Sequence, residues 1–309
     1  VDSEDVPLNI SRETLQENLV ISKIKNNLVS QILSHLQKMA KDDEKKYFEF
    51  WKEFSKYFKM GYNDYANVEK FSELLRFNSS NDENADGLTS FAEYVERVKE
   101  NQKEIYYLTL PSRDAVESNP YLEIFKKKGM EVLFLYEPVD EFVMDAIRKF
   151  KDFDLKSVEH ADLEKMNELE DVRETKKAKK LSEDDVKSFD KLLRRMKDIL
   201  GDRVTDVVES KRLTDSPSCL VSPDGTMTSS MQKIMNLMNK DVAPPKKSME
   251  INKDHELVRN LLKIYKNSAK DKYLEQITEQ LYESALLLEG YLTDPHKMVN
   301  RIQDILEKS

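Results

Sequence analysis

Apolar side chains recur every three or four residues along the first part of the chain, which predicts a series of amphipathic helices. The first is expected at residues 11–40, the second at 43–59, and a third, shorter one begins near Val68. Their apolar positions are Leu15, Ile21, Ile24, Leu28, Ile32, Leu36 and Met39; Tyr47, Phe50, Trp51, Phe54 and Phe58; and Val68, Phe71, Leu74 and Leu75. The aromatic stripe of the second helix could be a binding surface, but burial in a helical coil is the commoner use of such area.

Strand and helix patterns alternate in the next segment. A polar loop at residues 78–87 leads to Ser90 and Glu93, which fit a capping box. Strands are predicted near 104–110 and 131–136, with a helix at 113–128 between them and another at 140–150 after them. This order predicts a parallel, right-handed βαβ unit. Its first strand-to-helix turn, TLPSRDA, lacks a glycine-rich cradle, so the pattern does not indicate a nucleotide site.

A charge-rich stretch separates two predicted domains. Residues 154–185 include KKAKK at 176–180 and are typical of a solvated linker or an exposed helix. The first domain is expected at residues 1–158, with a helical coil at 11–77 and a small α/β subdomain at 88–153. A linker at 159–184 leads to the second domain, 185–309, with strands near 203–213, 219–222 and 249–252. The expected fold class is helix-rich α+β: a three-helix coil, a βαβ subdomain, and a mixed α/β domain ending in a helical hairpin.

Two amphipathic helices are predicted at the end of the chain. One stops near Gly290, a frequent residue after a helix, and the other starts with Asp294 as N-cap and Pro295 as first residue. Such a hairpin buries little surface alone, whereas two copies related by a two-fold axis would form a four-helix bundle. The side chains expected at this dimer interface are Leu274, Ile277, Leu281, Ala285, Leu288, Met298, Ile302 and Ile305.

Composition narrows the possible classes of function. Of 309 residues, 39% are hydrophobic, which suffices for folded cores, and the net charge of -9 argues against nucleic acid as a partner. The single cysteine, Cys219, excludes an internal disulfide and is expected to be a small buried residue. The histidines lack metal-ligand spacing, and no apolar run reaches the length of a membrane span. No signal peptide is recognisable, and we expect the chain to be a fragment of a longer protein.

A methionine-rich segment follows the predicted strand at 219–222. Met227, Met231, Ile234 and Met238 are spaced by four, three and four residues, and Met235 lies beside them. One helical face would therefore carry flexible, polarizable side chains, which suit the binding of varied partners. Ordinary core packing is the alternative.

Arg12 is out of place at the start of the first helix. Ser11 suits an N-cap and Glu13 suits the first turn, but a cation is unfavourable where the helix dipole is positive. Arg12 either pairs with a nearby carboxylate such as Asp5 on the surface, or it reaches toward a ligand anion such as phosphate.

Five segments of the chain, in order, resemble motifs of the heat-shock protein 90 family of chaperones. They are DSEDVPLNISRE at 2–13, LLRFNSS at 74–80, LTSFAEYVERVKENQKEIYYLT at 88–109, EVLFLYEPVDEF at 131–142 and RLTDSPSCLV at 212–221. The resemblance covers nearly the whole chain and corresponds to the distal middle domain and the C-terminal dimerisation domain of that family.

The resemblance implies a divided catalytic site. The arginine matching Arg12 reaches the γ-phosphate of ATP held in a separate N-terminal domain, Gln16 supports it, and Asn9 belongs to the same loop. ATP and Mg would bind to that domain, so the fragment alone is expected to be inactive and the full-length parent to be an ATPase.

The resemblance also implies the partners. The terminal hairpin would form a homodimer, and the methionine-rich helix would contact non-native or partly folded client proteins. A purely structural dimerisation or scaffold module, with no client binding, is the alternative.

Two features suggest a subtype. The chain ends in RIQDILEKS, without an MEEVD tail or a KDEL-type signal, and TMTSSMQKIM replaces an aromatic-containing segment. Both resemble the mitochondrial member and the bacterial high-temperature protein G. The mitochondrial matrix is the expected compartment, with the bacterial or eukaryotic cytoplasm as the alternative, and tetratricopeptide co-chaperones are not expected partners.

Overall fold

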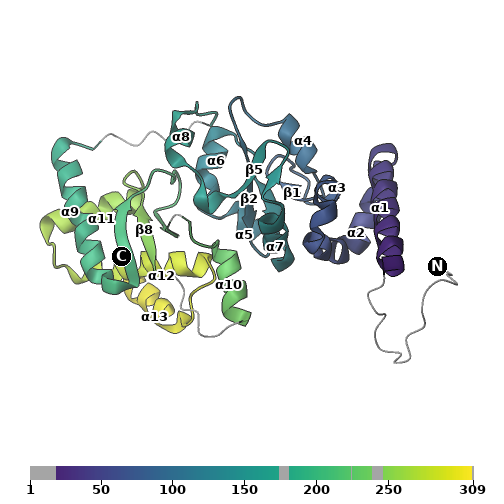
Figure 1. Cartoon of the computed structure of the whole chain (residues 1–309). Coiled ribbons are helices and arrows are strands. Elements are labelled where there is room, and N and C mark those ends of the chain that lie inside the picture. Colours follow the sequence, from purple (N-terminus) through teal and green to yellow (C-terminus); the bar gives the residue numbers. More distant parts are fainter. Residues whose placement is uncertain (1–18, 174–180, 224, 239–245, 308–309) are drawn as a thin grey trace.

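The first part of the chain is a coil of helices, seen at one end of the molecule in Figure 1. The structure, a computed structural model, describes residues 19–173, 181–223, 225–238 and 246–307. The coil contains α1 (Leu19–Asp42), α2 (Glu44–Lys59) and α3 (Val68–Leu74), with the short turns η1 (Met60–Asn63) and η2 (Tyr65–Asn67) between α2 and α3. Helix α2 begins where the Asp43 carboxylate accepts from the Lys46 N–H at 3.1 Å, as an N-cap should.

The aromatic stripe of α2 is mainly core, as predicted. Tyr47 and Trp51 are buried against α1 and α3, whereas Phe54 is 52% exposed. On α1 the predicted face is partly wrong, because Leu33 and Leu36 are buried while Leu28 and Ile32 are exposed. Apolar residues cover a wider face of α1 than the face that contacts the rest of the coil. Periodicity alone therefore could not identify which of these residues are buried.

A five-stranded sheet forms the middle of the molecule, in the order β1-β3-β2-β5-β4. Its strands are β1 (Asn78–Ser79), β2 (Glu104–Thr109), β3 (Leu133–Leu135), β4 (Lys149–Phe150) and β5 (Phe153–Ser157). Strand β2 pairs in parallel with β3 and with β5, which confirms the parallel βαβ prediction. Side chains of β2 alternate between two cores, with Ile105 toward the coil and Tyr106 toward α6.

The helices around this sheet follow the predictions with two corrections. Helix α4 (Phe91–Glu96) starts with the expected capping box of Ser90 and Glu93. The helix predicted at 113–128 is two helices, α5 (Arg113–Glu117) and α6 (Leu122–Lys128), because Pro120 cannot continue the first. The helix predicted at 140–150 is α7 (Pro138–Ile147), and its last residues instead form β4, which pairs with β5 in a hairpin.

The charged stretch begins with ordered structure. The turn η3 (Val158–His160) and helix α8 (Leu163–Glu168) contribute the buried side chains Val158 and Met166 to the core beside α6. Residues 174–180, which include KKAKK, lie outside the described residues. The proposed domain boundaries at 158/159 and 184/185 stay predictions.

The last part of the chain packs helices around a three-stranded sheet of order β6-β8-β7. It comprises α9 (Glu183–Leu200), η4 (Gly201–Arg203), β6 (Val204–Glu209), β7 (Ser218–Val221), α10 (Ser229–Met238), β8 (Lys247–Ile251), α11 (Glu256–Asn267), α12 (Lys272–Leu288) and α13 (Pro295–Leu306). Strands β6 and β8 are parallel, and β7 and β8 are antiparallel. The helix-rich α+β class is therefore confirmed, with two mixed sheets and C-terminal helices. Within the described ranges, no helix combines the length and apolar character that a membrane crossing requires.

Candidate functional site

The predicted catalytic side chains belong to the segment before α1. Asn9, Arg12 and Gln16 all lie outside the described residues, which begin at Leu19.

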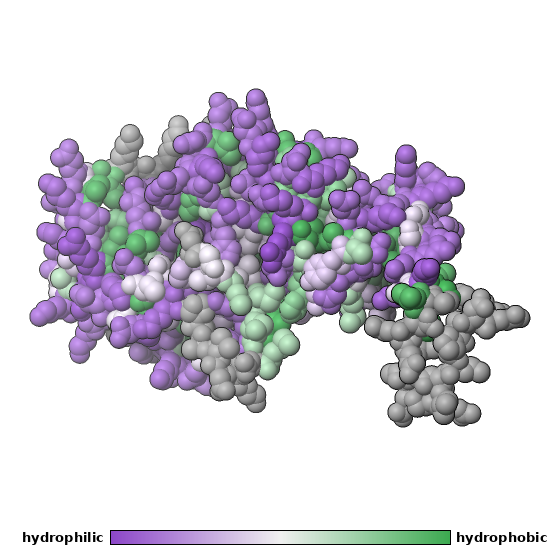
Figure 2. All heavy atoms as spheres, viewed as in Figure 1, coloured by the Kyte–Doolittle hydropathy of each residue, from purple (hydrophilic) through white to green (hydrophobic). Residues whose placement is uncertain are grey.

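The methionine-rich segment is a helix with an exposed end. Met227 is 53% exposed, just before α10, while Leu237 and Met238 at its last turn are 84% and 74% exposed. Met231, Ile234 and Met235 are half-buried, and the side chains that α10 buries are the polar Ser229 and Gln232. Figure 2 shows hydrophobic side chains gathered over α10. A helix that buries polar residues and exposes apolar ones is not packed as an ordinary core helix.

The first turn of α10 is held by buried carboxylates that come from the α/β subdomain. The Thr228 hydroxyl donates to Glu141 Oε2 at 2.8 Å, and the Ser229 N–H donates to both oxygens of Glu159 at 3.0 and 3.1 Å. The Ser229 hydroxyl donates to the same carboxylate at 2.7 Å. All four side chains are buried. Burial raises the pKa of Glu141, and the neighbouring charges of Glu159 and Asp140 raise it further.

A second set of buried polar groups meets this cluster from the last part of the chain. The Lys247 ammonium on β8 donates to the Ser229 hydroxyl at 2.6 Å and forms an ion pair with Glu289, at the end of α12. Tyr121 donates to the Leu220 carbonyl and, at 3.3 Å, to Glu289. Burial raises the pKa of Glu289, although Lys247 opposes the shift. The pair therefore depends on good geometry to offset its desolvation.

A carboxylate of α6 fixes the loop before β7 in a similar way. Glu123 accepts the backbone N–H groups of Thr214, Asp215 and Ser216, the last two at 2.8 and 2.9 Å. Arg212 lies in the same loop, forms a buried ion pair with Glu250 at 3.2 Å and places its guanidinium over the Tyr121 ring. The motif RLTDSPSCLV thus joins the α/β subdomain to the last sheet through part-buried contacts of Glu123 and buried contacts of Tyr121.

The terminal hairpin divides its apolar residues between two surfaces. Leu274, Ile277, Leu281 and Ala285 are buried in the core formed with α9 and α11, and Met298 is also buried. These side chains therefore pack within the core of a single copy of the chain. Exposed apolar side chains on the hairpin are Leu287, Leu288, Val299, Ile302 and Leu306, and Ile305 is half-buried.

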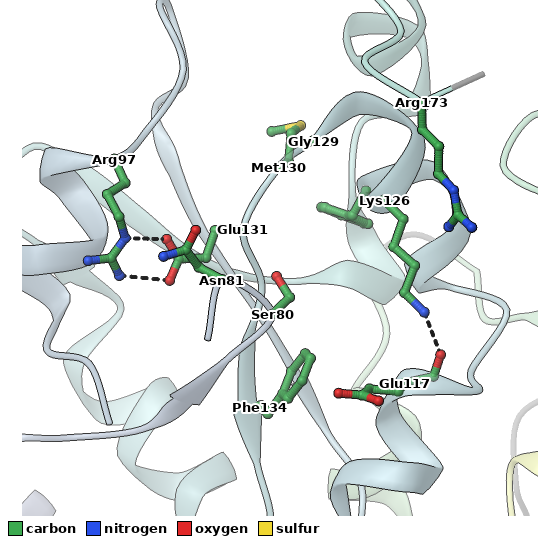
Figure 3. A pocket seen from close by; sticks show the side chains of 11 residues that line it. Ser80, Asn81, Arg97, Glu117, Lys126, Gly129, Met130, Glu131, Phe134 and Arg173 are labelled. Atoms are coloured by element: carbon green, nitrogen blue, oxygen red, sulfur yellow. Dashed lines mark hydrogen bonds and ion pairs between the residues drawn. The ribbon is translucent and has the colours of Figure 1, made fainter. Parts of the chain in front are cut away.

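A cavity of about 490 Å³ lies on the α/β subdomain (Figure 3). Its walls include Arg97, Lys126 and Arg173 as cations and Glu117 and Glu131 as anions. The Lys126 ammonium donates to the Glu117 carbonyl at 2.6 Å, and Arg97 binds both oxygens of Glu131 at 2.8 and 2.9 Å. Arg97 pairs with Glu131, and Glu117 pairs with Arg113 outside the cavity, so we assign no ligand to this cavity.

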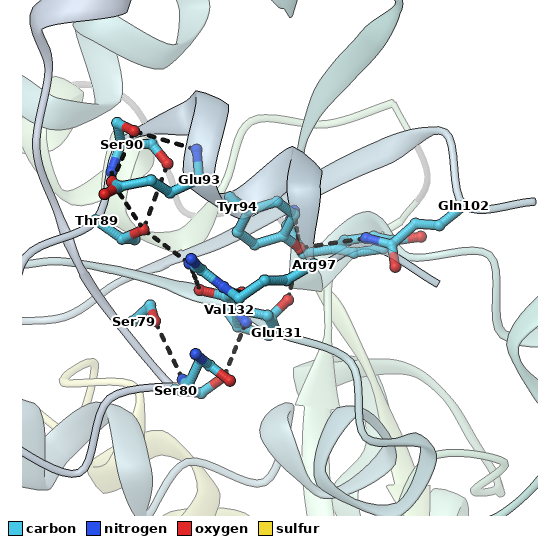
Figure 4. Close-up of polar contacts among 12 residues, drawn as sticks. Ser79, Ser80, Thr89, Ser90, Glu93, Tyr94, Arg97, Gln102, Glu131 and Val132 are labelled. Carbon is cyan, nitrogen blue, oxygen red and sulfur yellow. Dashed lines mark hydrogen bonds and ion pairs between the residues drawn. The ribbon is translucent and has the colours of Figure 1, made fainter. Parts of the chain in front are cut away.

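The polar contacts beside this cavity hold α4 onto the sheet (Figure 4). Arg97 donates to Thr89 at 2.7 Å, and the Tyr94 hydroxyl donates to the Glu131 carbonyl at 2.6 Å. Directly after β1, the Ser80 hydroxyl accepts the N–H of Val132, the residue before β3, at 2.9 Å. We interpret the network as structural.

We also searched the described residues for metal-ligand clusters and for a reactive thiol. Over the described part of the chain, no three His, Cys, Asp or Glu side chains come together as metal ligands. Cys219 is buried, as predicted, and burial raises the pKa of its thiol, so the thiolate nucleophile is disfavoured.

Sequence reasoning did not identify Glu141, Glu159, Thr228 and Ser229 as a cluster. Thr228, directly before the amphipathic helix, is a recognisable N-cap residue. Nothing local indicates that carboxylates about 70 and 90 residues earlier complete the cap.

Known proteins of one family match this chain along its whole length. The family profile described as Hsp90 protein matches residues 1–309. The chaperone protein HtpG of Oleidesulfovibrio alaskensis is 52% identical over 309 residues, which are 100% of this chain and 49% of that protein. The HtpG proteins of Nitratidesulfovibrio vulgaris and Desulfitobacterium hafniense are 48% and 40% identical over all of this chain, and they are covered over 48% and 49% of their lengths. The chain therefore spans about half the length of these curated relatives.

Proposed function

This chain belongs to the Hsp90 family, and from that premise we propose that it is the client-binding and dimerising half of an ATP-dependent chaperone of the HtpG type. The observation that carries the proposal is the exposed apolar face at α10, whose opposite side is fixed by buried polar contacts. Partly folded proteins expose apolar segments, and a methionine-rich face can adapt to many of them.

The catalytic part of the proposal concerns Arg12, with Gln16 and Asn9 beside it in the sequence. In the full-length protein, ATP and Mg would bind to an N-terminal domain, and Arg12 would reach the γ-phosphate when the domains close. The chain by itself is then expected to turn over no ATP. The named relatives are bacterial, which favours the bacterial cytoplasm over the mitochondrial matrix as the compartment.

Replacing exposed methionines should weaken client binding. Changing Met227 and Met238 together to serine removes apolar area that a client would bury, and we expect affinity to fall at least tenfold, or about 1.4 kcal/mol. The probe is a small protein kept partly folded by reduction and carboxymethylation, and binding is measured by fluorescence anisotropy. Met60→Ser, at a methionine that is 66% exposed on η1, is the matched control. Equal affinity for all three proteins would contradict a client role for α10, and no binding by any would favour the scaffold alternative.

A dimer through the terminal hairpin would use the residues that one copy leaves exposed. Val299, Ile302 and Leu306 are spaced by three and four residues and lie on one face of α13. Leu274, Ile277, Leu281 and Ala285 would support this interface from inside the core. Apolar surface on a short hairpin is best covered by the same surface of a second copy.

Adding a charge to this face should separate the dimer. Ile302→Asp would bury a carboxylate in the interface, and we expect dimerisation to weaken by roughly 30-fold, or about 2 kcal/mol. Asn300→Asp adds the same charge at an exposed position a quarter to half a turn away from that face and is the control. Sedimentation equilibrium measures both. The interface would lie elsewhere if the two variants associate equally well.

A further inference from the structure

The start of α10 is bound by carboxylates from a distant part of the chain. Unpaired N–H groups and the helix dipole make a carboxylate favourable at a helix start. The first turn of α10 contains no acidic residue of its own. That role falls to Glu159, in η3 of the α/β subdomain, and to Glu141 on α7.

These contacts are strong and specific. The Ser229 N–H is shared between both oxygens of Glu159 at 3.0 and 3.1 Å, and the Ser229 hydroxyl donates to the same carboxylate at 2.7 Å. Glu159 and Ser229 are both buried, so water does not compete for these hydrogen bonds. Thr228 has a double function, because its hydroxyl donates to Glu141 at 2.8 Å and accepts the Met231 N–H at 3.1 Å. The first turn of α10 therefore depends on both carboxylates.

Contacts to the second domain meet at the same residue. Lys247 of β8 donates to the Ser229 hydroxyl, and Tyr291, after α12, donates to the Ser229 carbonyl at 2.8 Å. Ser229 is thus bonded to the α/β subdomain and to the last domain at once. Beyond this anchor, the exposed Leu237 and Met238 lie two turns away.

We propose that Glu141 and Glu159 form a carboxylate clamp that couples the position of the apolar face of α10 to the position of the α/β subdomain. A displacement of η3 and α7 relative to β8 pulls the Ser229 contacts apart or carries the helix start with it. The exposed face then moves with the α/β subdomain. The clamp itself is independent of the proposed client function, whereas its consequence for binding rests on that function.

The test is hydrogen exchange of α10 in the full chain. Glu159→Gln keeps the size of the side chain but places an amide N–H₂ opposite one of the two Ser229 donors. We expect amide exchange in residues 229–233 to accelerate roughly tenfold. Glu164→Gln is the matched control, because this glutamate lies on α8 nearby and its ion pair with Lys211 is exposed. Thr228→Val removes both the bond to Glu141 and the cap on the Met231 N–H without changing charge, and it should accelerate the same amides.

The outcomes separate the clamp from the client proposal. Exchange in β2 reports the fold of the subdomain and should not change. Unchanged exchange in α10, or equal acceleration in α10 and β2, would overturn the clamp. The second readout is affinity for the reduced, carboxymethylated protein, which should change in Glu159→Gln and not in Glu164→Gln. Faster exchange confined to α10 with unchanged affinity would support the clamp and count against α10 as the client surface.

Discussion

Replacing Lys247 by alanine is expected to lower the free energy of unfolding by about 3–5 kcal/mol, the usual cost of breaking a buried ion pair by removing one partner. Lys247 and Glu289 are both only 7% exposed. The ammonium also donates to the Ser229 hydroxyl and lies over the Tyr291 ring. The variant would leave Glu289 buried, with the Tyr121 hydroxyl at 3.3 Å as its remaining described partner.

The pH dependence of this loss has a definite sign. Burial already raises the pKa of Glu289, and removing Lys247 removes the main opposing charge, so the pKa rises further. A carboxyl group with a raised pKa favours the folded state at low pH, and that contribution is lost as the pH rises through the raised pKa. Lys247→Ala should therefore be less destabilised near pH 5 than near pH 8. Urea unfolding at both pH values measures the difference.

An exposed ion pair provides the control. Lys211 lies 3.4 Å from Glu164, with the side chains 62% and 83% exposed, so Lys211→Ala should cost less than about 1 kcal/mol. Replacing both buried partners, as Lys247→Met with Glu289→Leu, should recover much of the loss, because no unpaired charge remains. If Lys247→Ala and Lys211→Ala were equally stable, the buried pair would have no special role.

Regular helices were predictable because their pattern is local. The hydrophobic repeats that predicted the ends of α12 and α13 depend only on residues within a few turns, and Asp294 and Pro295 mark the start of α13 as expected. The β4–β5 hairpin was missed because its strand β4 has two residues, too short for a period of two. Pairing with β5, rather than its own sequence, makes it a strand.

The division of the hairpin residues could not be predicted for a different reason. A repeat of three and four residues identifies one apolar stripe, and on α12 that stripe includes both buried Leu281 and exposed Leu288. A residue of this stripe is buried where α9 and α11 pack against α12 and exposed where they do not. That packing is a property of the tertiary fold and cannot be read from the repeat. The clamp at Ser229 was hidden similarly, because it joins residues 70 positions apart.

The other large effect is expected at Arg12, in the full-length protein. Alanine at this position would remove the guanidinium group of Arg12. In the proposed mechanism this group reaches the γ-phosphate only when the domains close. Arginines in such positions stabilise charge that develops in the transition state, and their loss lowers turnover by about 10³-fold or more. Nucleotide binding should change little, since the phosphate is held mainly by the domain that binds ATP. A fall in kcat with an unchanged Kd for ATP is thus the expected signature.

A variant at a second cation of the same predicted helix is the control for a general effect of removing positive charge. Lys23→Ala removes an exposed positive charge from α1 and should leave turnover within about twofold of the unaltered protein, as is usual for surface changes away from special features. Gln16→Ala should give an intermediate loss, because Gln16 is proposed to support the arginine rather than to contact phosphate. Single-turnover ATP hydrolysis by the four proteins orders these effects. Turnover in Arg12→Ala equal to that in Lys23→Ala would mean that Arg12 is only a surface charge, paired as the sequence alone allows with a carboxylate such as Asp5.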